Sequence, residues 1–504
     1  MTPKETELGR KRAIDQSACN KDYSCLDGFC PSFVTVEDTQ VRKPKAVGDV
    51  PFPALPEPGT VDLSDPYNVV VTGIGGTGVV TIGAILGMAA HLEQKGVSVL
   101  DVAGLAQKNG MVYSHLRFAA APHDIHAVRI SAGGADLLIG CDMVSASDTE
   151  TLGKLRAGNS KAVINEHQTM TADFTRQPDM MFPEEGFKRT LREETGENAV
   201  DFIEATALAR KLLGDTIAAN MMVVGFAYQK GLLPVSEEAI ERAIELNGVA
   251  VEFNKQAFLW GRRAAHDLTA VEAIVGRYDE KPQPFELEGF IERRVADLTA
   301  YQNKAYADRY SDWVERIRAT EAKAMPGSTA LTEAVARGLF KLMAYKDEYE
   351  VARLYTDGRF EQAIRDTFAD GGRIRFHLAP PLLAERDPDT GHLKKKEYGA
   401  WIMPVFRFLA GLKGLRGTAL DPFGYSAERK MERQLISDYE KQLAEIADNL
   451  TADNHAAALQ LAGLPMRMRG FGHVKEANVE AAKACEADLI ATFRDPGRAP
   501  QAAE

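Results

Sequence analysis

Three cysteines near the N-terminus are the residues with the clearest capacity for chemistry. Cys19, Cys25 and Cys30 are spaced C-x5-C-x4-C, and a proline follows the last of them. Thiolates this close in the chain can converge on one metal centre. The pattern favours an iron–sulfur cluster, with a structural zinc ion as the competing site and three unrelated thiols as the plain alternative. Such sites normally need four ligands, so the fourth must come from a distant residue or another chain.

A glycine-rich stretch is the second candidate site. Within Val69–Thr81, the residues that could line it are Gly73, Gly75, Gly76, Thr77 and Gly78. The stretch predicts a buried strand, a tight turn and the start of a helix. Gly73, Gly75 and Gly78 fit G-x-G-x-x-G, in which backbone N–H groups and the helix dipole receive a phosphate or another anion. A turn that needs glycine only for close packing explains the spacing equally well.

Asp101 is the candidate acid for a dinucleotide ribose, because it ends the next predicted strand, Val97–Asp101. It lies farther beyond Gly73 than the roughly 20 positions expected for that role. An aspartate that merely begins a loop is at least as good an explanation. An NAD(P)-dependent dehydrogenase is therefore an alternative function.

Further polar candidates lie around a predicted turn at Asn109-Gly110. They are Gln107, Asn109, Ser114 and Arg117. The last two fall in a predicted strand, Met111–Phe118, whose alternation places Ser114 on one face and Arg117 on the other.

The elements that would position these residues predict an α/β fold. Strand candidates at Ala135–Gly140 and Lys161–Asn165 alternate with helical stretches, which is typical of a parallel, doubly wound sheet. Ser236 is the predicted N-cap of a helix that ends near Asn247-Gly248.

The second half of the chain is charge-rich and mostly helical by period. Apolar residues at helical spacing predict one helix from Leu331 that continues through Tyr345–Tyr355, and another around Met431–Tyr439. Arg373–Pro381 predicts a short strand. The loops Arg416–Tyr425 and Arg467–His473 could bind an anion, although helix packing and salt bridges explain their residues better.

Length, charge and cysteine content exclude some classes of protein. The chain has 504 residues, a formal net charge of −12 and only five cysteines. The acidic balance argues against a nucleic-acid binder, and the cysteine count argues against a secreted disulfide framework. No secretory leader and no run of about 18 apolar residues is found, so we expect a cytoplasmic protein that does not span a membrane.

We expect three parts. Residues 1–60 form a cysteine segment and a linker stiffened by the prolines of Val50–Pro58. Residues 61–265 form a Rossmann-like, doubly wound α/β domain. Residues 266–504 form a mostly helical domain.

The glycine turn, the Gln107–Arg117 stretch and the cysteine segment together resemble the long, fused type of indolepyruvate ferredoxin oxidoreductase. The resemblance covers the C-terminal part of that enzyme. It implies that residues 1–60 are half of a ferredoxin-like segment, that 61–265 are the 2-oxoacid:ferredoxin oxidoreductase gamma domain, and that 266–504 are a domain of unassigned role.

The resemblance also implies a reaction: oxidative decarboxylation of an aryl 2-oxoacid with coenzyme A, giving an acyl-CoA, carbon dioxide and reduced ferredoxin. Thiamine diphosphate would be bound by a partner subunit or domain, which would also carry the missing ferredoxin-like half. The three cysteines would be an incomplete ligand set for a 4Fe–4S cluster, and alone they should hold no stable cluster.

The resemblance assigns the gamma-domain loops to a wall of the active site. Backbone N–H groups at Gly75–Gly78 and polar groups of Gln107, Asn109, Ser114 and Arg117 would contact the ligand, and no in-chain nucleophile or general base is evident. A non-catalytic assembly subunit, with the helical half as its docking surface, is a further alternative.

Overall fold

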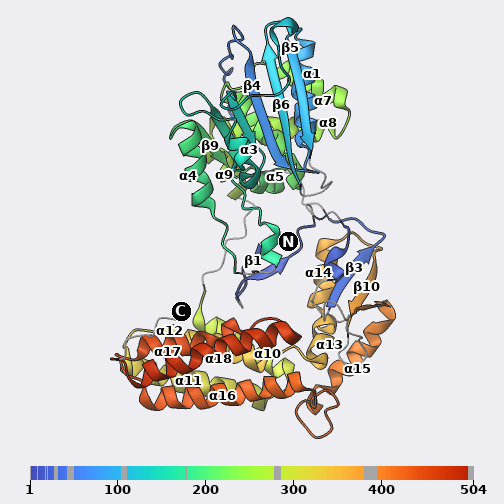
Figure 1. The fold of residues 1–504 in the computed structure, drawn as a ribbon. Helices are drawn as coiled ribbons and strands as arrows, with labels where there is room; N and C mark the ends of the chain where they lie inside the picture. The colour runs from blue at the N-terminus through green and yellow to red at the C-terminus, as the bar shows by residue number, and fades with distance from the viewer. Residues whose placement is uncertain are drawn as a thin grey trace. The chain divides into compact units, whose positions relative to one another are not determined.

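The chain folds into two compact units. The computed structural model describes residues 2–7, 9–16, 19, 21–27, 32–42, 50–103, 110–175, 177, 179–276, 285–379 and 394–497. One unit comprises Met1–Lys21 and Lys43–Lys281, and the other comprises Asp22–Arg42 and Pro282–Glu504. The chain therefore passes from one unit to the other three times. Figure 1 shows the elements of each unit.

The first unit is built on a six-stranded sheet in the order β5-β6-β4-β7-β8-β9. The strands are β4 (Tyr67–Ile74), β5 (Gly96–Ala103), β6 (Met111–Ala119), β7 (Leu137–Gly140), β8 (Lys161–Asn165) and β9 (Val200–Ile203). β4, β7, β8 and β9 pair in parallel, whereas β6 is antiparallel to both β4 and β5. The α/β fold class is confirmed, and the sheet that was predicted as parallel is a mixed one. β5 and β6 are consecutive strands that pair directly, without the crossover that parallel pairing requires.

Helices cover both faces of this sheet. They are α1 (Val79–Leu92), α2 (Met143–Ala146), α3 (Thr149–Leu152), α4 (Glu184–Thr195), α5 (Ala205–Leu213), α6 (Ala219–Gln229), α7 (Glu237–Asn247), α8 (Val251–His266) and α9 (Leu268–Gly276). Val69 and Val71 pack into one core with α1, α6, α7 and α8, and Val70 packs into another with α2 and α4. Successive strand residues point to opposite faces, so β4 is buried on both sides. Ser236 caps α7 as predicted, accepting a 3.2 Å hydrogen bond from the Ala239 N–H.

Two glycines let α6 and α8 cross closely. A Cβ atom on Gly225 would lie 2.0 Å from the carbonyl oxygen of Phe258, and one on Gly261 would lie 1.9 Å from that of Met222. Both distances are far inside van der Waals contact. Each helix therefore needs a glycine where the backbone of the other passes.

The unit also includes a short N-terminal hairpin of β1 (Thr2–Lys4) and β2 (Lys11–Ala13). The Arg12 Nε donates a 3.2 Å hydrogen bond to the carbonyl oxygen of Phe174, which ties the hairpin to the α/β core.

The second unit contains a three-stranded antiparallel sheet in the order β11-β10-β3, which we call the small sheet. Its strands are β3 (Ser32–Glu37), β10 (Arg373–Leu378) and β11 (Lys396–Gly399). The predicted strand at Arg373–Pro381 is confirmed as β10. A compact apolar core lies against the sheet, with Phe376 and Phe406 at its centre.

The remainder of this unit is mostly helical, as predicted. Its helices are α10 (Leu287–Tyr301), α11 (Lys304–Ala324), α12 (Ala330–Met343), α13 (Glu348–Thr356), α14 (Arg359–Thr367), α15 (Met403–Gly411), α16 (Ala427–Asn449), α17 (His455–Gly463) and α18 (Gly472–Arg494). The prediction that one helix continues from Leu331 through Tyr355 is wrong. The chain breaks between α12 and α13, where Asp347 caps α13 by accepting a 2.8 Å hydrogen bond from the Glu350 N–H. Within the described residues, no helix has the length and apolar character needed to cross a membrane.

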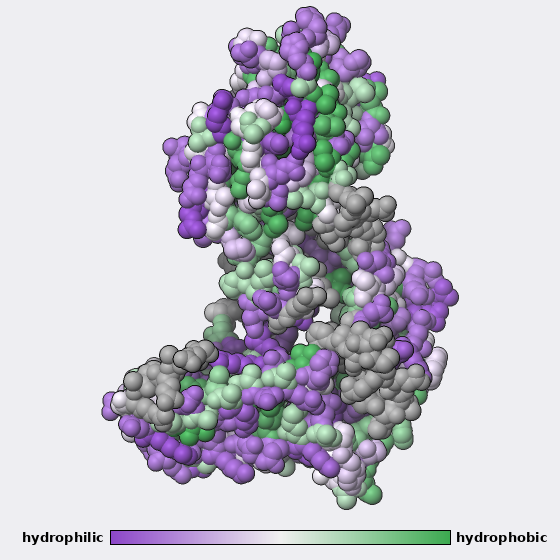
Figure 2. All heavy atoms as spheres, viewed as in Figure 1, coloured by the Kyte–Doolittle hydropathy of each residue, from purple (hydrophilic) through white to green (hydrophobic). Residues whose placement is uncertain are grey.

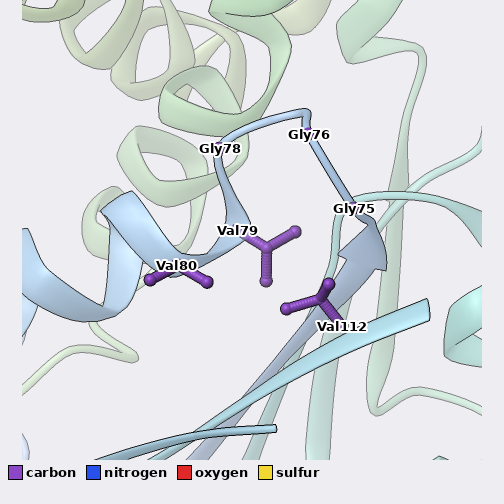
Figure 3. Close-up of a pocket in the computed structure, with 6 residues that line it drawn as sticks. All are labelled: Gly75, Gly76, Gly78, Val79, Val80 and Val112. Atoms are coloured by element: carbon purple, nitrogen blue, oxygen red, sulfur yellow. The ribbon is translucent and has the colours of Figure 1, made fainter. Parts of the chain in front are cut away.

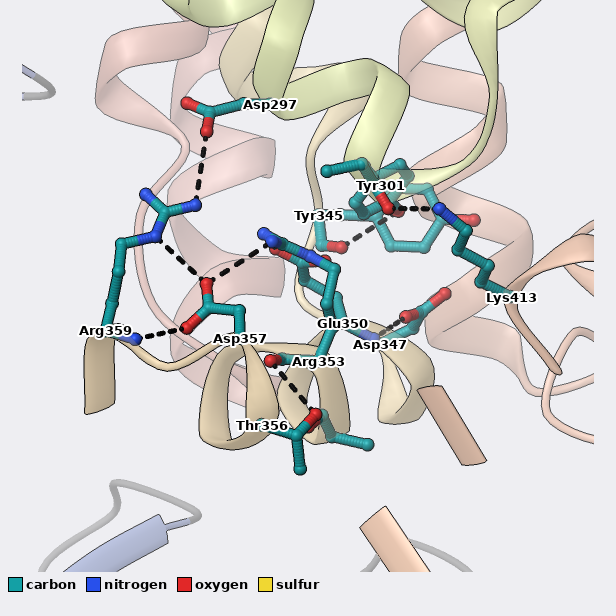
Figure 4. A network of polar contacts seen from close by, with 12 residues as sticks. Asp297, Tyr301, Tyr345, Asp347, Glu350, Arg353, Thr356, Asp357, Arg359 and Lys413 are labelled. Atoms are coloured by element: carbon teal, nitrogen blue, oxygen red, sulfur yellow. Dashed lines mark hydrogen bonds and ion pairs between the residues drawn. The ribbon is translucent and has the colours of Figure 1, made fainter. Parts of the chain in front are cut away.

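A buried ion pair organises the break between α12 and α13. The Arg416 guanidinium donates to both carboxylate oxygens of Asp347 at 2.5 and 2.9 Å, and to the carbonyl oxygen of Tyr301 at 2.6 Å. It also lies 3.6 Å from the centre of the Tyr301 ring. Figure 4 shows Asp347 and Tyr301 among neighbouring polar contacts, which include the hydrogen bond from the Tyr301 hydroxyl to the carbonyl oxygen of Tyr345. Arg416 is thus a packing residue, in agreement with the helix-packing explanation of its loop.

Candidate functional site

The glycine turn begins where β4 leaves the sheet. A Cβ atom on Gly73 would lie 2.8 Å from both Cys141 Cβ and Val79 Cγ2, so the start of α1 could not pack against the strand end. The Gly75 N–H donates a 2.6 Å hydrogen bond to the carbonyl oxygen of Gly110. These contacts hold the turn against the start of β6.

The turn itself requires left-handed backbone. Gly76 has φ +86° and Gly78 has φ +97°, which L side chains rarely adopt. The Thr77 hydroxyl folds back and donates a 2.7 Å hydrogen bond to the carbonyl oxygen of Ile74. The Asn220 side chain donates at 2.7 Å to the carbonyl oxygen of Thr77. Thr77 therefore shapes the turn, and Asn220 is a supporting residue that the sequence analysis did not identify.

A shallow pocket of about 300 Å³ opens beside this turn. Figure 3 shows the residues that line it: Gly75, Gly76, Gly78, Val79, Val80 and Val112. Gly78 is the N-cap of α1 and provides no side-chain cap. The first N–H groups of a helix have no partner within the helix, and the helix dipole adds partial positive charge there. The pocket thus combines backbone donors with apolar walls, which suits an anionic or carbonyl group attached to an apolar one. None of its lining residues has an ionisable side chain.

An apolar surface continues from this pocket along the sheet edge. Figure 2 shows hydrophobic side chains gathered where α1 and β5 lie, and the exposed ones on this side are Val80, Met88, Leu92 and Val99. Val80 belongs to both the pocket and this surface.

Asp142 is a buried carboxylic acid beside the turn, and the sequence analysis did not identify it. It follows β7 and caps α2, with its Oδ1 accepting a 2.8 Å hydrogen bond from the Ser145 N–H. Its Oδ2 lies 3.6 Å from the position of a Cβ on Gly73 and is buried without a hydrogen-bond partner among the described residues. Burial raises the pKa of this carboxyl group. The D-x-x-S spacing after a strand was the available signal, and it marks an N-cap.

Ser114 and Arg117 are not brought to the turn. Ser114 is fully buried beneath α1, where a Cβ on Gly83 would lie 2.4 Å from its hydroxyl. Arg117 pairs in register with Asn68, at the opposite end of β4 from the turn, and its Nε donates a 2.8 Å hydrogen bond to Asn68 Oδ1. Gln107 and Asn109 lie outside the described residues. The contribution of these four side chains to a ligand site stays a prediction.

The sheet order argues against a dinucleotide site. β6 lies between β4 and β5, so the strand carrying Asp101 is not adjacent to the strand that enters the glycine turn. Asp101 pairs with Ser114, which pairs with Val71, in the middle of the sheet rather than at its carboxyl edge. A ribose acid must lie beside the strand end, and Asp101 does not.

The cysteines do not form a complete metal site within the described residues. The Cys19 thiol accepts a 3.4 Å hydrogen bond from the Lys21 N–H, and Cys25 lies in a short 3₁₀ helix, η1 (Ser24–Asp27). Cys30 lies outside the part of the chain that the structure describes. In that part, no group of three metal-ligating side chains is placed to hold an ion.

Comparison with known proteins finds relatives of the first unit by sequence. Residues 68–264 match the family described as pyruvate ferredoxin/flavodoxin oxidoreductase, and residues 287–487 match a family of unknown function, DUF6537. Indolepyruvate oxidoreductase subunit IorB of Pyrococcus horikoshii is 29% identical over 209 residues, and that of Thermococcus kodakarensis is 27% identical over 209 residues. Each alignment covers 40% of this chain and 97% of the relative.

A solved structure, the pyruvate oxidoreductase subunit PORC from Thermotoga maritima, is 19% identical and aligns with a TM-score of 0.29, over 40% of this chain and 96% of its own. The assignment depends on the sequence matches, which cover almost the whole length of the IorB subunits. Residues 68–264 are therefore a gamma-type segment of the indolepyruvate and 2-oxoacid:ferredoxin oxidoreductases, contained in a longer chain.

Proposed function

We propose that this component of a 2-oxoacid:ferredoxin oxidoreductase acts on indolepyruvate or a related aryl 2-oxoacid. The assembled enzyme would oxidatively decarboxylate the 2-oxoacid and pass two electrons to ferredoxin. The acyl group would go to coenzyme A, and carbon dioxide would be released. The alignment with the IorB subunits along 97% of their length is the observation that carries this proposal.

The pocket at the glycine turn supports a binding role for this chain. Its donors are backbone N–H groups, its walls are valines, and its lining has no acid, base or nucleophile. Such a wall can orient an anionic group of coenzyme A or the 2-oxoacid by hydrogen bonding while excluding water from the apolar part. Thiamine diphosphate, bound by a partner subunit or domain, would supply the carbanion chemistry.

The same partner would complete the iron–sulfur relay. Cys19, Cys25 and Cys30 would give three of four ligands to a 4Fe–4S cluster, with the remaining ligand on the partner's ferredoxin-like half.

We place this enzyme in the cytoplasm, since the count of five cysteines suits a reducing compartment.

The test is anaerobic co-expression with the thiamine-diphosphate-binding partner, followed by viologen reduction with indolepyruvate and coenzyme A. Pyruvate and 2-oxoglutarate in place of indolepyruvate are the matched controls. Reduction that depends on indolepyruvate supports the proposal. Reduction with another 2-oxoacid alone overturns the substrate assignment. A complex that binds iron but reduces no dye with any 2-oxoacid indicates an assembly subunit instead.

A further inference from the structure

The cysteine segment runs directly into a strand of the second unit. Cys30 is two positions before Ser32, the first residue of β3. Every residue of β3 pairs with β10, from Ser32 opposite Leu378 to Glu37 opposite Arg373. β3 is thus an integral strand of the small sheet, although it is far from β10 in the sequence.

Side chains on both faces of β3 are engaged by the second unit. Val34 packs against the apolar core that contains Phe376 and Phe406. On the other face, the Thr35 hydroxyl lies 3.0 Å from the Nε2 of His377. Glu37 accepts a 3.3 Å hydrogen bond from Arg375 at the end of the strand.

The segment is also fastened on each side of β3. On the side of the cysteines, the Lys395 ammonium donates to the carbonyl oxygen of Leu26 in η1 and lies 5.6 Å from the centre of the Phe33 ring. On the other side, the Arg42 Nε donates to the carbonyl oxygens of Arg365 at 2.8 Å and Phe368 at 2.7 Å.

We propose that the second unit fixes the position of the cysteine-bearing turn at Cys25 by binding the nearby β3, Ser32–Glu37, as an edge strand of the small sheet. This gives a role to the part of the chain that matches a family of unknown function. The segment has little apolar material with which to build a core of its own, so its order depends on the sheet it joins. As a statement about cluster ligands, the inference rests on the proposed function. As a statement about docking, it rests on the contacts of β3.

The experiment uses the full-length chain, with Val34→Asp as the test variant. A charge in the apolar core should release β3, and amide hydrogen exchange of residues 32–37 should accelerate at least about tenfold. Val128→Asp is the matched control, because Val128 is 54% exposed in the first unit. It should leave exchange of residues 32–37 unchanged. The second measurement is iron content after anaerobic reconstitution with the thiamine-binding partner, which should fall at least about twofold in Val34→Asp alone.

If Val34→Asp unfolds the second unit, seen as rapid exchange in α16, Arg42→Ala replaces it, because this substitution removes a surface clamp and leaves the core intact. Unprotected amides at residues 32–37 in the unmodified chain would overturn the inference. The inference would also be overturned if the unmodified complex bound no iron, or if releasing β3 left its iron content unchanged. The dye assay separates the two proposals. If β3 is protected and iron uptake depends on Val34, but no 2-oxoacid reduces the dye, the proposed function is wrong and this inference still holds.

Discussion

Asp101 and Ser114 are joined by a 2.5 Å hydrogen bond in which the buried serine hydroxyl donates to Oδ1 of the carboxylate. Because this bond commits Asp101 to β6, the chain should not bind a nicotinamide dinucleotide. We expect no heat of binding for NADH or NADPH in titration calorimetry at concentrations up to about 1 mM, which corresponds to a binding free energy weaker than about 4 kcal/mol. Saturable binding that is lost in Asp101→Asn would restore the dehydrogenase hypothesis.

Anion binding at the glycine turn can be tested with two substitutions that differ only in charge. Gly76 has left-handed φ, which asparagine and aspartate tolerate better than other L residues, and a Cβ there meets nothing within 4 Å. In the reconstituted enzyme, Gly76→Asp should raise the KM for coenzyme A or for the 2-oxoacid at least about tenfold over Gly76→Asn, a difference of about 1.4 kcal/mol. Steady-state kinetics on both variants make the comparison. Equal KM values for both substrates would mean that no anion lies at the turn.

The crossing of α6 and α8 should be intolerant of one methyl group. Gly225→Ala places a Cβ against the Phe258 carbonyl oxygen. It should lower the unfolding free energy of the first unit by about 3 kcal/mol or more. Gly186→Ala is the matched control, since Gly186 lies in α4 with nothing within 4 Å of its Cβ position. This control substitution should raise the unfolding free energy of the first unit by roughly 0.5–1 kcal/mol. Urea unfolding of both variants reports the difference, and equal midpoints would contradict the close crossing.

Glu321 should make the second unit sensitive to acid. Its carboxylate is fully buried and accepts hydrogen bonds from the N–H groups of Leu331 and Thr332, and from the Thr332 hydroxyl at 2.7 Å. Although burial alone would raise it, these bonds and His455 lower the pKa of Glu321 to about 2. The folded state therefore gains stability from the ionised form above the unfolded pKa, and this gain is lost as pH falls through about 2.

The matching variant is Glu321→Gln, which we expect to reduce the unfolding free energy at pH 7 by about 2–3 kcal/mol. The difference from the unmodified chain should shrink as pH falls from about 4.5 toward about 2. Glu333→Gln is the control, because the i,i+4 pair that Glu333 makes with Arg337 is worth less than about 0.5 kcal/mol. Urea midpoints across this pH range measure both, and a pH-independent difference would contradict the assignment.

The Arg416–Asp347 pair should be costly to break. Both side chains are 3% exposed, so Arg416→Ala leaves an uncompensated buried carboxylate. We expect the unfolding free energy of the second unit to fall by about 3–5 kcal/mol. Arg316→Ala breaks an exposed pair with Asp448 and should cost less than about 1 kcal/mol. Thermal unfolding of the two variants gives the comparison. Similar losses would mean that water reaches Asp347.

Local patterns predicted the glycine turn and most strands of the first unit. The apolar run into Gly73, the Ser236 cap and the alternation along β6 each depend on neighbouring residues, so they are visible in the sequence. The insertion of β6 between β4 and β5 is a pairing choice between distant strands, and no single strand encodes it. The same limit hid Asn220, which supports the turn from another helix.

The candidate site was predicted in part. Gly75, Gly76 and Gly78 do line the pocket. Ser114 and Arg117 have side chains that could bind a ligand, but their surroundings in the sheet engage them elsewhere. Type and spacing of residues do not reveal such partners.

The pairing of β3 with β10 also sets an order of events during synthesis. Thr35 and His377 are in contact but stand 342 residues apart in the chain. At about 5–20 residues per second, the ribosome needs roughly 20 to 70 seconds to make the second partner after the first. Throughout that interval the nascent cysteine segment lacks the strand that orders it. Under the proposed function, cluster assembly before translation ends would therefore meet an unpaired β3, and assembly afterwards would meet a paired one.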